Sequence, residues 1–527
     1  MATRIPFIEL NRDKIYLFAL YLFVIVLPLS NAGISIAVFL LIFSWLISGS
    51  FRDKWKKLIS LRFPLIFCCI PLVYLMGSLY TDHPEIALKE IIRSLYWIAF
   101  PVVISTSRPL HPKEAHRLIN LFLFSVTLAA LVIAVKLTWP ENFHLQNFRE
   151  ASLIDHIPYS YQLAFAIFLL IDKIFIQKLT DVSIGKKILW VAWVLMLTTI
   201  LLILKSFTGY FFFAGAALAG LLFVILYYPR YRAIVMVILL MLVMAPSVYI
   251  YRCIHFFYQV PKFTPENIEW KTHYGKPYHH DFQDKLKENG QYVNLFICHE
   301  ELREAWNQRS AIPYDSVWNG QDSIKWVIHR YMTSLGLRKD RDGIHQLTEQ
   351  DIRNIEKGLG NHIYQNYRLG IYPRIYETIW EIDGYLQTGD PNRKSFAQRI
   401  EMYRVSWAAI KKSPMIGYGT GDAATALVEQ ARLQGSRMDP GEFRSPHNQY
   451  LGYLIKFGLL GTFFIFAALW LPFIYWKAYR TFPIFVLFAG LWFANFGEGN
   501  LESFIGINFF GIFYCLYLWA MPDRFNH

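Results

Sequence analysis

The sequence has little of what metal and nucleotide sites require. Its 527 residues include five cysteines, and no group of Cys and His residues has the spacing of a zinc site. We therefore expect no structural metal and no cofactor. Cys253 and Cys298 lie in or beside a large polar segment, whereas the other three cysteines lie in apolar runs. Those two thiols either pair, if the segment lies in an oxidising compartment, or remain free.

Charge is also scarce. Charged residues make up 17% of the chain, hydrophobic residues make up 54%, and the mean hydropathy is +0.28. This balance excludes an ordinary soluble globular protein and is typical of a multispanning membrane protein with one polar insert. A net charge of +13 often indicates nucleic-acid binding, but here much of the excess lies in short loops between apolar runs. We therefore expect no nucleic-acid partner.

Long apolar runs recur along the chain, with no internal repeat and no low-complexity tract. The first run is followed directly by a second, so we expect no cleavable signal peptide. The sequence therefore predicts an all-α polytopic membrane protein with about twelve transmembrane helices. The runs lie near residues 15–29, 32–48, 63–80, 94–106, 118–137, 159–176, 188–205, 209–228, 233–252, 457–475, 482–498 and 505–521.

Basic clusters occupy alternate loops between these runs, for example at 52–57 and 230–232. Because cytoplasmic loops carry an excess of Lys and Arg, both termini are predicted to be cytoplasmic. The same alternation places a large insert on the opposite side of the membrane. We divide the chain into a membrane domain at 1–252 with about nine spans, the insert at 253–456, and about three C-terminal spans at 457–527.

The insert, about 200 residues long, is too large to be a structureless loop, and its pattern is mainly helical. Thr348 and Asp351 resemble a capping box that opens a helix through residue 357. Residues 374–387 and 396–412 are two further predicted helices. Asp422 has the position of a cap for another helix that runs through residue 432, and Gly- and Asn-rich turns separate these elements.

The predicted helix at 396–412 carries a basic and aromatic stripe. Arg399, Tyr403, Trp407 and Lys411 are spaced by four residues and so share one face. A planar guanidinium holds phosphate well because it donates two parallel hydrogen bonds. The stripe therefore indicates either a phosphate-binding face or an amphipathic helix that lies on the membrane surface near lipid headgroups.

A glycine-rich turn follows this helix. Residues 417–421 read Gly-Tyr-Gly-Thr-Gly, but a helix and Ser-Pro precede them, so the context excludes a dinucleotide site. Gly417 and Gly419 instead predict a tight turn whose backbone approaches either a ligand or another helix closely.

A polar motif leads directly into the apolar run at 457–475. Its His447 is either a base that takes a proton from a sugar hydroxyl, or a residue that caps the following helix or bonds a carbonyl. Glu498 and Glu502 flank the end of the run at 482–498, where they either meet His447 or lie at the water interface. Lys205, beside the turn at 206–209, either reaches an outward-facing anion or extends to the membrane surface.

The order of these motifs resembles one family. A short span-turn-span at 206–209 is followed by Gln-Arg-Ile-Glu-Met-Tyr at 398–403, Ser-Pro-Met-Ile-Gly-Tyr-Gly at 413–419, and His-Asn-Gln-Tyr-Leu at 447–451 with Gly-Leu-Leu-Gly at 458–461. In the order and spacing of these motifs, the chain resembles the bacterial O-antigen ligase and polymerase superfamily. Residues 330–339 also resemble Bacteroidetes members. The resemblance covers the membrane plan of the whole chain, with its sharp motifs in about residues 325–465.

The resemblance implies a GT-C-like inner-membrane glycosyltransferase that acts on the periplasmic face. The donor is then a glycan on undecaprenyl diphosphate, and the acceptor is lipid A–core or a growing glycan. Membrane lipids surround the protein. The reaction requires neither a nucleotide sugar nor a metal. Arg399 matches the arginine that holds the diphosphate, and His447 matches the base. Where related sequences carry a second arginine this chain has Phe207. The expected substrate-contacting residues are Lys205, Arg404, Arg444, Tyr403, Gly417, Gly419 and Glu502, of which Lys205, Arg404 and Arg444 are the candidates to replace that arginine.

Ligase activity is our first interpretation and repeat-unit polymerase the second, because both share these motifs. A lipid-linked glycan flippase or exporter would be expected to show two related halves and charges buried at mid-membrane, which the sequence does not reveal. A non-catalytic partner that binds lipid-linked glycan is a further alternative, to which Phe207 lends support.

Overall fold

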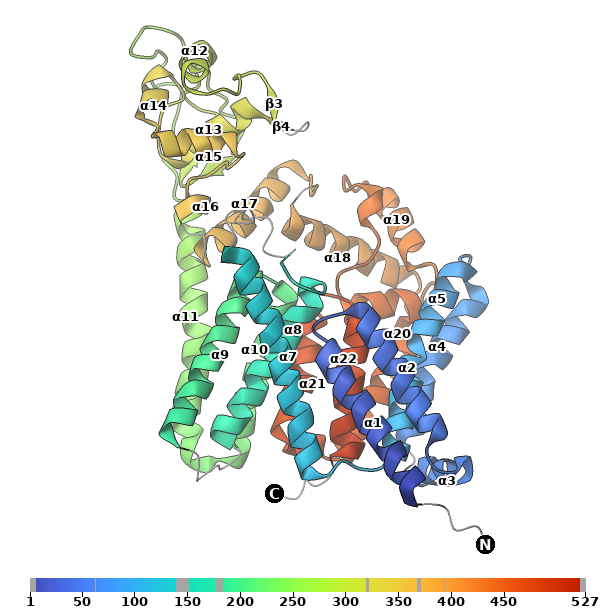
Figure 1. The fold of residues 1–527 in the computed structure, drawn as a ribbon. Coiled ribbons are helices and arrows are strands. Elements are labelled where there is room, and N and C mark those ends of the chain that lie inside the picture. Colours follow the sequence, from blue (N-terminus) through green and yellow to red (C-terminus); the bar gives the residue numbers. More distant parts are fainter. Residues whose placement is uncertain are drawn as a thin grey trace. The chain divides into compact units, whose positions relative to one another are not determined.

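The computed structural model is mostly helical, as predicted (Figure 1). It describes residues 6–61, 63–138, 151–176, 183–318, 322–366, 371–392 and 394–521. The chain forms two compact units. The first comprises Met1–Leu239 and Glu401–His527, and the second comprises Leu240–Ile400. The domain boundaries predicted after residues 252 and 456 stay a prediction.

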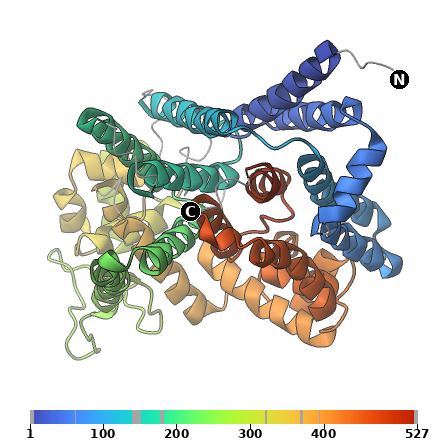
Figure 2. The same cartoon turned by 90° about the horizontal axis from the view of Figure 1, so that it is seen from below.

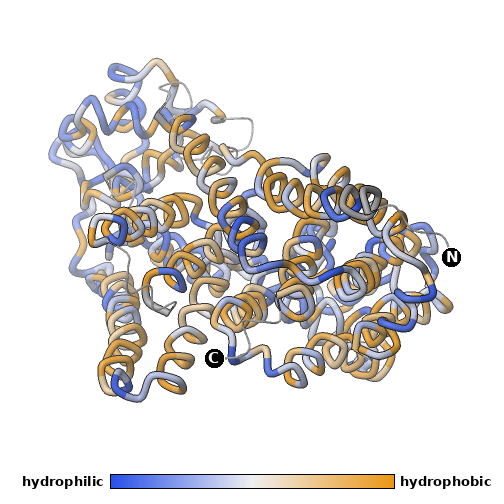
Figure 3. Tube along the Cα trace, turned by 60° about the horizontal axis from the view of Figure 1, so that its bottom comes forward, coloured by the Kyte–Doolittle hydropathy of each residue, from blue (hydrophilic) through white to orange (hydrophobic). Residues whose placement is uncertain are grey.

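The first unit is a bundle of apolar helices, and each of the predicted apolar runs overlaps one of its helices or α11. Figure 2 shows α1 and α2, in dark blue, side by side, and hydrophobic residues dominate along the bundle helices in Figure 3. The helices are α1 (Pro6–Val26), α2 (Asn31–Ile47), α3 (Phe51–Leu61), α4 (Cys69–Gly77), α5 (Pro84–Ser94), α6 (Tyr96–Thr106), α7 (Pro112–Thr138), α8 (His156–Ile171), α9 (Ile184–Leu204), α10 (Phe207–Tyr227), α19 (Ala423–Leu433), α20 (Gln449–Tyr475), α21 (Phe482–Ala494) and α22 (Phe504–Cys515). Helices α11 (Arg232–Tyr258) and α18 (Ser395–Lys412) continue from one unit into the other.

Within the described residues, seven helical segments are long and apolar enough to cross a membrane, and the sharply bent pair α2–α3 would make an eighth. Two further apolar segments, Phe482–Ala494 and Phe504–Ala520, are shorter. The protein is thus a multispanning membrane protein by length and composition, while the predicted count of about twelve is not confirmed. Several predicted runs form helices of 11 to 13 residues, such as α6 and α21, which is below the length of a full span.

The second unit combines short helices with two very short hairpins. Its elements are α12 (His299–Arg309), α13 (Ile324–Ser334), α14 (Arg341–Gln346), α15 (Glu349–Glu356), α16 (Ile363–Asn366), α17 (Tyr372–Thr388), the antiparallel pair β1 (Lys287–Glu288) and β2 (Gln291–Tyr292), and the antiparallel pair β3 (Val317–Trp318) and β4 (Asp322–Ser323). Residues 259–298 are turns, bridges and short strands rather than helix. Pro261, Pro265 and Pro277 lie in that stretch, and proline interrupts helices.

Local sequence signals predicted the positions of four helices, α15, α17, α18 and α19, and missed α12, α13, α14 and α16. Thr348 and Asp351 form the predicted capping box, in which the Asp351 N–H donates to Thr348 Oγ1 at 3.2 Å and the Thr348 N–H donates to Asp351 Oδ2 at 2.9 Å. Helices α17 and α18 match the predictions at 374–387 and 396–412. Asp422 occupies the N-cap position of α19, but its carboxylate makes no cap hydrogen bond and instead accepts the N–H of Asp82 at 3.0 Å.

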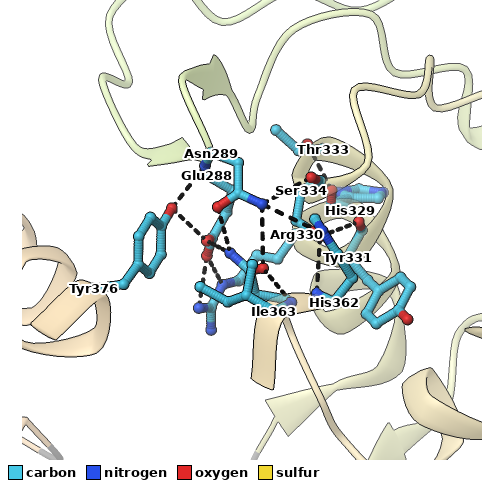
Figure 4. Close-up of polar contacts among 11 residues, drawn as sticks. Glu288, Asn289, His329, Arg330, Tyr331, Thr333, Ser334, His362, Ile363 and Tyr376 are labelled. Atoms are coloured by element: carbon cyan, nitrogen blue, oxygen red, sulfur yellow. Dashed lines mark hydrogen bonds and ion pairs between the residues drawn. The ribbon is translucent and has the colours of Figure 1, made fainter. Parts of the chain in front are cut away.

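A buried polar network ties the second unit together (Figure 4). Glu288 is fully buried, and its carboxylate pairs with Arg330 at 2.7 Å and accepts hydrogen bonds from Asn361 at 2.6 Å and Tyr376 at 3.1 Å. Burial raises the pKa of Glu288, while Arg330 acts in the opposite direction. Because a buried charge is costly without partners, this network fixes β1, α13 and α17 against one another.

The two cysteines of the second unit are free. Cys253 lies in an apolar cluster with Phe257 and Tyr376, and Cys298 lies in another with Tyr278 and Phe296. Of the two alternatives for these thiols, the structure has the unpaired one.

Candidate functional site

His447 lies immediately before α20, and the residue that caps this helix is Asn448. The Asn448 side chain accepts the N–H groups of Tyr450 at 3.0 Å and Leu451 at 3.1 Å, which are free donors at a helix start. The alternative in which His447 caps the helix is therefore wrong. His447 has a φ of +48°, an uncommon conformation for a residue other than glycine.

The imidazole of His447 faces a carboxylate. Its Nδ1 lies 3.0 Å from Glu498 Oε2 and 3.3 Å from Glu498 Oε1. The His447 side chain is 45% exposed and the Glu498 side chain 22% exposed. Within the described part of the chain, Nε2 of His447 has no hydrogen-bond partner. A proton on Nδ1, held by the carboxylate, leaves a lone pair on the accessible Nε2, which is the arrangement of a general base and its orienting acid.

Glu498 belongs to the loop 495–503 between α21 and α22, and three contacts fix this loop to the start of α20 and to α18. The Gln449 N–H donates to the Asn495 carbonyl at 2.9 Å, and the Leu501 N–H donates to Gln449 Oε1 at 2.8 Å. The Tyr403 hydroxyl donates to the Phe496 carbonyl at 2.8 Å. Tyr403, expected to contact substrate, thus also holds the loop that carries Glu498.

The second acidic residue of this loop takes part in a separate buried cluster. Glu502 Oε1 lies 2.7 Å from Lys456 Nζ and accepts the Tyr74 hydroxyl at 2.8 Å. Lys456 Nζ also lies 2.8 Å from Glu90, and Arg93 donates to the Glu502 carbonyl at 3.0 Å. A cavity of about 10 Å³, room for roughly one water molecule, lies beside the cluster. Glu498, and not Glu502, is therefore the acid that meets His447.

Sequence reasoning missed Lys456, Glu90 and Arg93. Lys456 is one residue short of the predicted run at 457–475, yet it lies inside α20 and is only 8% exposed. A lone lysine at the edge of an apolar run could have indicated this cluster, because a lysine buried in a membrane protein requires acidic partners. Glu90 and Arg93 lie on the short amphipathic helix α5, and nothing local marks them as its partners.

The glycine-rich turn packs against a break in α20. The helix is interrupted at Gly458, which has a φ of +60° and a ψ of −164°. There the Tyr418 N–H donates to the Ile455 carbonyl at 2.8 Å, and the Gly419 N–H donates to the Lys456 carbonyl at 2.9 Å. A Cβ on Gly417 would lie 2.5 Å from the Ile455 carbonyl oxygen. Close approach to another helix, one of the two alternatives for this turn, is what the structure shows.

The other predicted cations lie in different surroundings. Arg404 is paired with Glu401 through two hydrogen bonds, at 2.9 and 2.6 Å. Arg444 is exposed, three residues before His447, and donates from Nε to the Gly441 carbonyl at 3.0 Å. Lys205 follows α9 in a left-handed conformation and is half-buried.

Arg399 lies on α18, half-buried, in the second compact unit. His447 lies in the first unit, so a common site for Arg399 and His447 stays a prediction. Within the described part of the chain, no group of three or more His, Cys, Asp or Glu side chains is placed to hold a metal ion.

These features define a multi-pass membrane protein with a His–Glu pair at the start of an apolar span. Residues 366–466 match the family model described as O-antigen ligase. The match confirms the resemblance to the O-antigen ligase and polymerase superfamily, and it includes Arg399, the glycine-rich turn and His447. It spans roughly a fifth of the chain. No curated protein matches the chain.

Proposed function

We propose that this protein is an inner-membrane glycosyltransferase of the O-antigen ligase type. It transfers a glycan from undecaprenyl diphosphate to a sugar acceptor such as lipid A–core, on the periplasmic face. The observation that carries the proposal is the His447–Glu498 pair, 3.0 Å apart at the start of α20, in which His447 belongs to the matched segment. A base held by a carboxylate beside an apolar span suits a reaction between a lipid-borne donor and a sugar hydroxyl.

In this mechanism His447 acts on the acceptor and not on the leaving group. The acceptor hydroxyl attacks the anomeric carbon of the donor, and its proton passes to Nε2 of His447 as the new carbon–oxygen bond forms. The bond from the anomeric carbon to the diphosphate oxygen breaks at the same time, and undecaprenyl diphosphate leaves with its electron pair. Glu498 stabilises the imidazolium that results. One displacement inverts the anomeric configuration.

Fixed cations stabilise the negative charge that grows on the leaving diphosphate. Arg399 is proposed as the principal clamp. Among the candidates for a second contact, Arg404 already has its charge balanced by Glu401. Arg444 is exposed and lies three residues from His447. Lys205 lies on the turn after α9, and Thr208 of that turn packs against Gly497, the neighbour of Glu498, so both cations stay candidates. The proposed mechanism assigns no step to a metal.

Ligase and polymerase differ only in the acceptor, so the test varies the acceptor. Purified protein in nanodiscs is incubated with lipid-linked oligosaccharide, with and without lipid A–core, and products are separated by size. Transfer that requires lipid A–core supports a ligase. Chain growth from donor alone supports the polymerase alternative. If neither product forms, while donor binding is retained, the non-catalytic alternative replaces both.

The orientation is part of the same proposal. The alternation of basic loops places both termini in the cytoplasm and the catalytic residues on the periplasmic side. The bilayer then holds the undecaprenyl chain while the diphosphate and glycan lie at the membrane surface, level with the start of α20.

A further inference from the structure

The second compact unit contains a cavity of about 160 Å³ that the proposed reaction does not use. One water molecule needs about 10–15 Å³ of such space, so the cavity has room for a ligand of several heavy atoms. Aromatic side chains form one part of its wall, and cationic and amide-bearing residues form another. The lining includes Phe263, Gln291, Tyr292, Phe296, Arg338 and Lys339.

Lys339 is the most unusual residue of this wall, because it is 2% exposed and its Nζ has a hydroxyl as its hydrogen-bond partner. The ammonium donates to Thr333 Oγ1 at 3.1 Å, and Thr333, on α13, also lines the cavity. Within the described part of the chain, no carboxylate lies within 4.0 Å of this nitrogen. Burial lowers the pKa of Lys339 to about 7, Arg338 acts in the same direction, and Asp340 acts in the opposite direction. A buried ammonium with no carboxylate in contact is costly, and an anion in the cavity would stabilise its charged form.

The backbone around Lys339 is rigidly fixed. Its N–H donates to the Phe296 carbonyl at 3.0 Å, and its carbonyl accepts the Cys298 N–H at 2.8 Å. Phe296 itself has a φ of +57°, a strained conformation for a bulky residue. Strained residues persist where the surroundings hold them in place and are enriched at binding sites. The fixed backbone means that the cavity exists before any ligand arrives.

Arg338 adds a second cation at the same cavity. Its guanidinium carbon lies 3.4 Å from the ring centroid of Phe296, and one nitrogen pairs with Glu269 at 3.1 Å. The side chain is 39% exposed, so it lies where the cavity wall reaches solvent. Phe263, Tyr292 and Phe296 contribute aromatic side chains to the lining, with the Arg338 guanidinium over the ring of Phe296, and Gln291 contributes an amide. A wall of this kind is typical of pockets that bury an apolar ring and orient it with a few polar groups.

We propose that this cavity binds a saccharide unit that carries an anionic substituent, a carboxylate or a phosphate. The anion pairs with Lys339, and Arg338, whose charge Glu269 partly balances, adds a second cation at the rim. The sugar ring lies against the aromatic faces of Phe263, Tyr292 and Phe296. This proposal rests on the proposed function in one respect only, which is that glycans are the substrate class. In this proposal the second unit recognises acidic sugars in the donor or acceptor glycan.

The test measures binding of small sugars to full-length protein in detergent, without a lipid-linked donor. Glucuronate, glucose 6-phosphate, glucose and inorganic phosphate are titrated by calorimetry into wild-type protein, Lys339→Met and the matched control Lys357→Met, which removes an exposed lysine of the same unit. Glucuronate or glucose 6-phosphate is expected to bind wild type and the control equally. Lys339→Met should lose at least about tenfold in affinity, as expected for one charge-assisted hydrogen bond.

Three results would overturn the proposal: no binding of either acidic sugar, glucose binding as tightly as glucuronate, or equal affinity in Lys339→Met. Inorganic phosphate that binds as tightly as glucose 6-phosphate would overturn the saccharide assignment. If Lys339→Met does not fold, as judged by size exclusion, Arg338→Gln is the second variant and should weaken binding in the same direction. A failure of transfer in the ligase assay leaves these binding results unaffected, so the two proposals are tested separately.

Discussion

The chemistry of single residues centres on which nitrogen of His447 is free. Glu498 lies against Nδ1, so the carboxylate selects the tautomer in which Nε2 is the base. The sequence revealed the motif around His447. It also left two alternatives for Glu498, which were contact with His447 or a place at the water interface. The choice between Glu498 and Glu502 was not readable, because it depends on Lys456 and Tyr74, which hold Glu502 elsewhere.

Glu498→Gln tests the role of the orienting acid. The amide retains the size of the side chain and a hydrogen-bond acceptor but no longer stabilises the imidazolium. We expect the transfer rate to fall by roughly 10²-fold or more, since loss of the carboxylate in comparable His–acid pairs costs up to about 10⁴. Membrane expression and the melting temperature should stay near those of wild type. An unchanged rate in well-folded Glu498→Gln would show that the His447–Glu498 contact is structural.

Arg399 provides a second test at the residue scale. Arg399→Lys retains the positive charge but loses the planar, two-pronged donor set, so we expect a large loss of transfer activity. Arg399→Ala should be worse, and Arg432→Ala, which removes an exposed arginine of α19, serves as the control. Activity is measured per molecule of folded protein in the membrane. Full activity of well-expressed Arg399→Ala would leave α18 as a membrane-surface helix.

At the scale of elements, α20 depends on a segment distant from it along the chain. At its break near Gly458, the Ile455 and Lys456 carbonyls accept hydrogen bonds from the Tyr418 and Gly419 N–H groups of the glycine-rich turn. The sequence predicted α15, α17 and α18 from caps and turns, because those signals are local. It placed the start of the last long span at residue 457 and not at Gln449, because it followed the apolar run and overlooked Asn448 as a local cap. The break at Gly458 was not readable, because its hydrogen bonds come from residues about forty positions away.

Gly417→Ala tests this dependence, with Gly435→Ala as its matched control. Both glycines have positive φ, of +69° and +62°, so both substitutions incur left-handed strain of about 1–2 kcal/mol. Only Gly417 is also crowded, since its new Cβ would lie 2.5 Å from the Ile455 carbonyl oxygen, whereas Gly435 has open space. Gly417→Ala should therefore lower the melting temperature clearly more than Gly435→Ala. Equal losses would mean that the turn does not support α20 as described.

At the scale of the whole molecule, composition and hydropathy predicted a helical membrane protein, and helices overlap all of the predicted apolar runs. The number of spans does not follow from this, because α6 and α21 are too short for a complete crossing. The cluster of Lys456, Glu90 and Glu502 joins α5, α20 and the loop 495–503. Such contacts between distant parts of a chain have no local sequence signature.

The orientation in the membrane is tested by reporter fusions. A reporter fused after Asp390 is expected to be periplasmic, and one fused after Arg232 is expected to be cytoplasmic, because basic loops face the cytoplasm. At each position one fusion carries alkaline phosphatase, which is active in the periplasm, and a second carries green fluorescent protein, which fluoresces in the cytoplasm. Two reporters on the same side would reject the orientation and, with it, the periplasmic location of the reaction.

The central claim is that His447 is the base of glycosyl transfer, and the most direct test is single-turnover transfer by purified His447→Ala. Donor binding is measured on the same preparation, and His273→Ala, which removes an exposed histidine of the insert, is the control. The account predicts a rate that is slower by roughly 10²–10⁴-fold, the usual contribution of general acid–base catalysis, with donor binding retained. Transfer by folded His447→Ala within about twofold of wild type, far below the range for loss of a general base, would contradict the account.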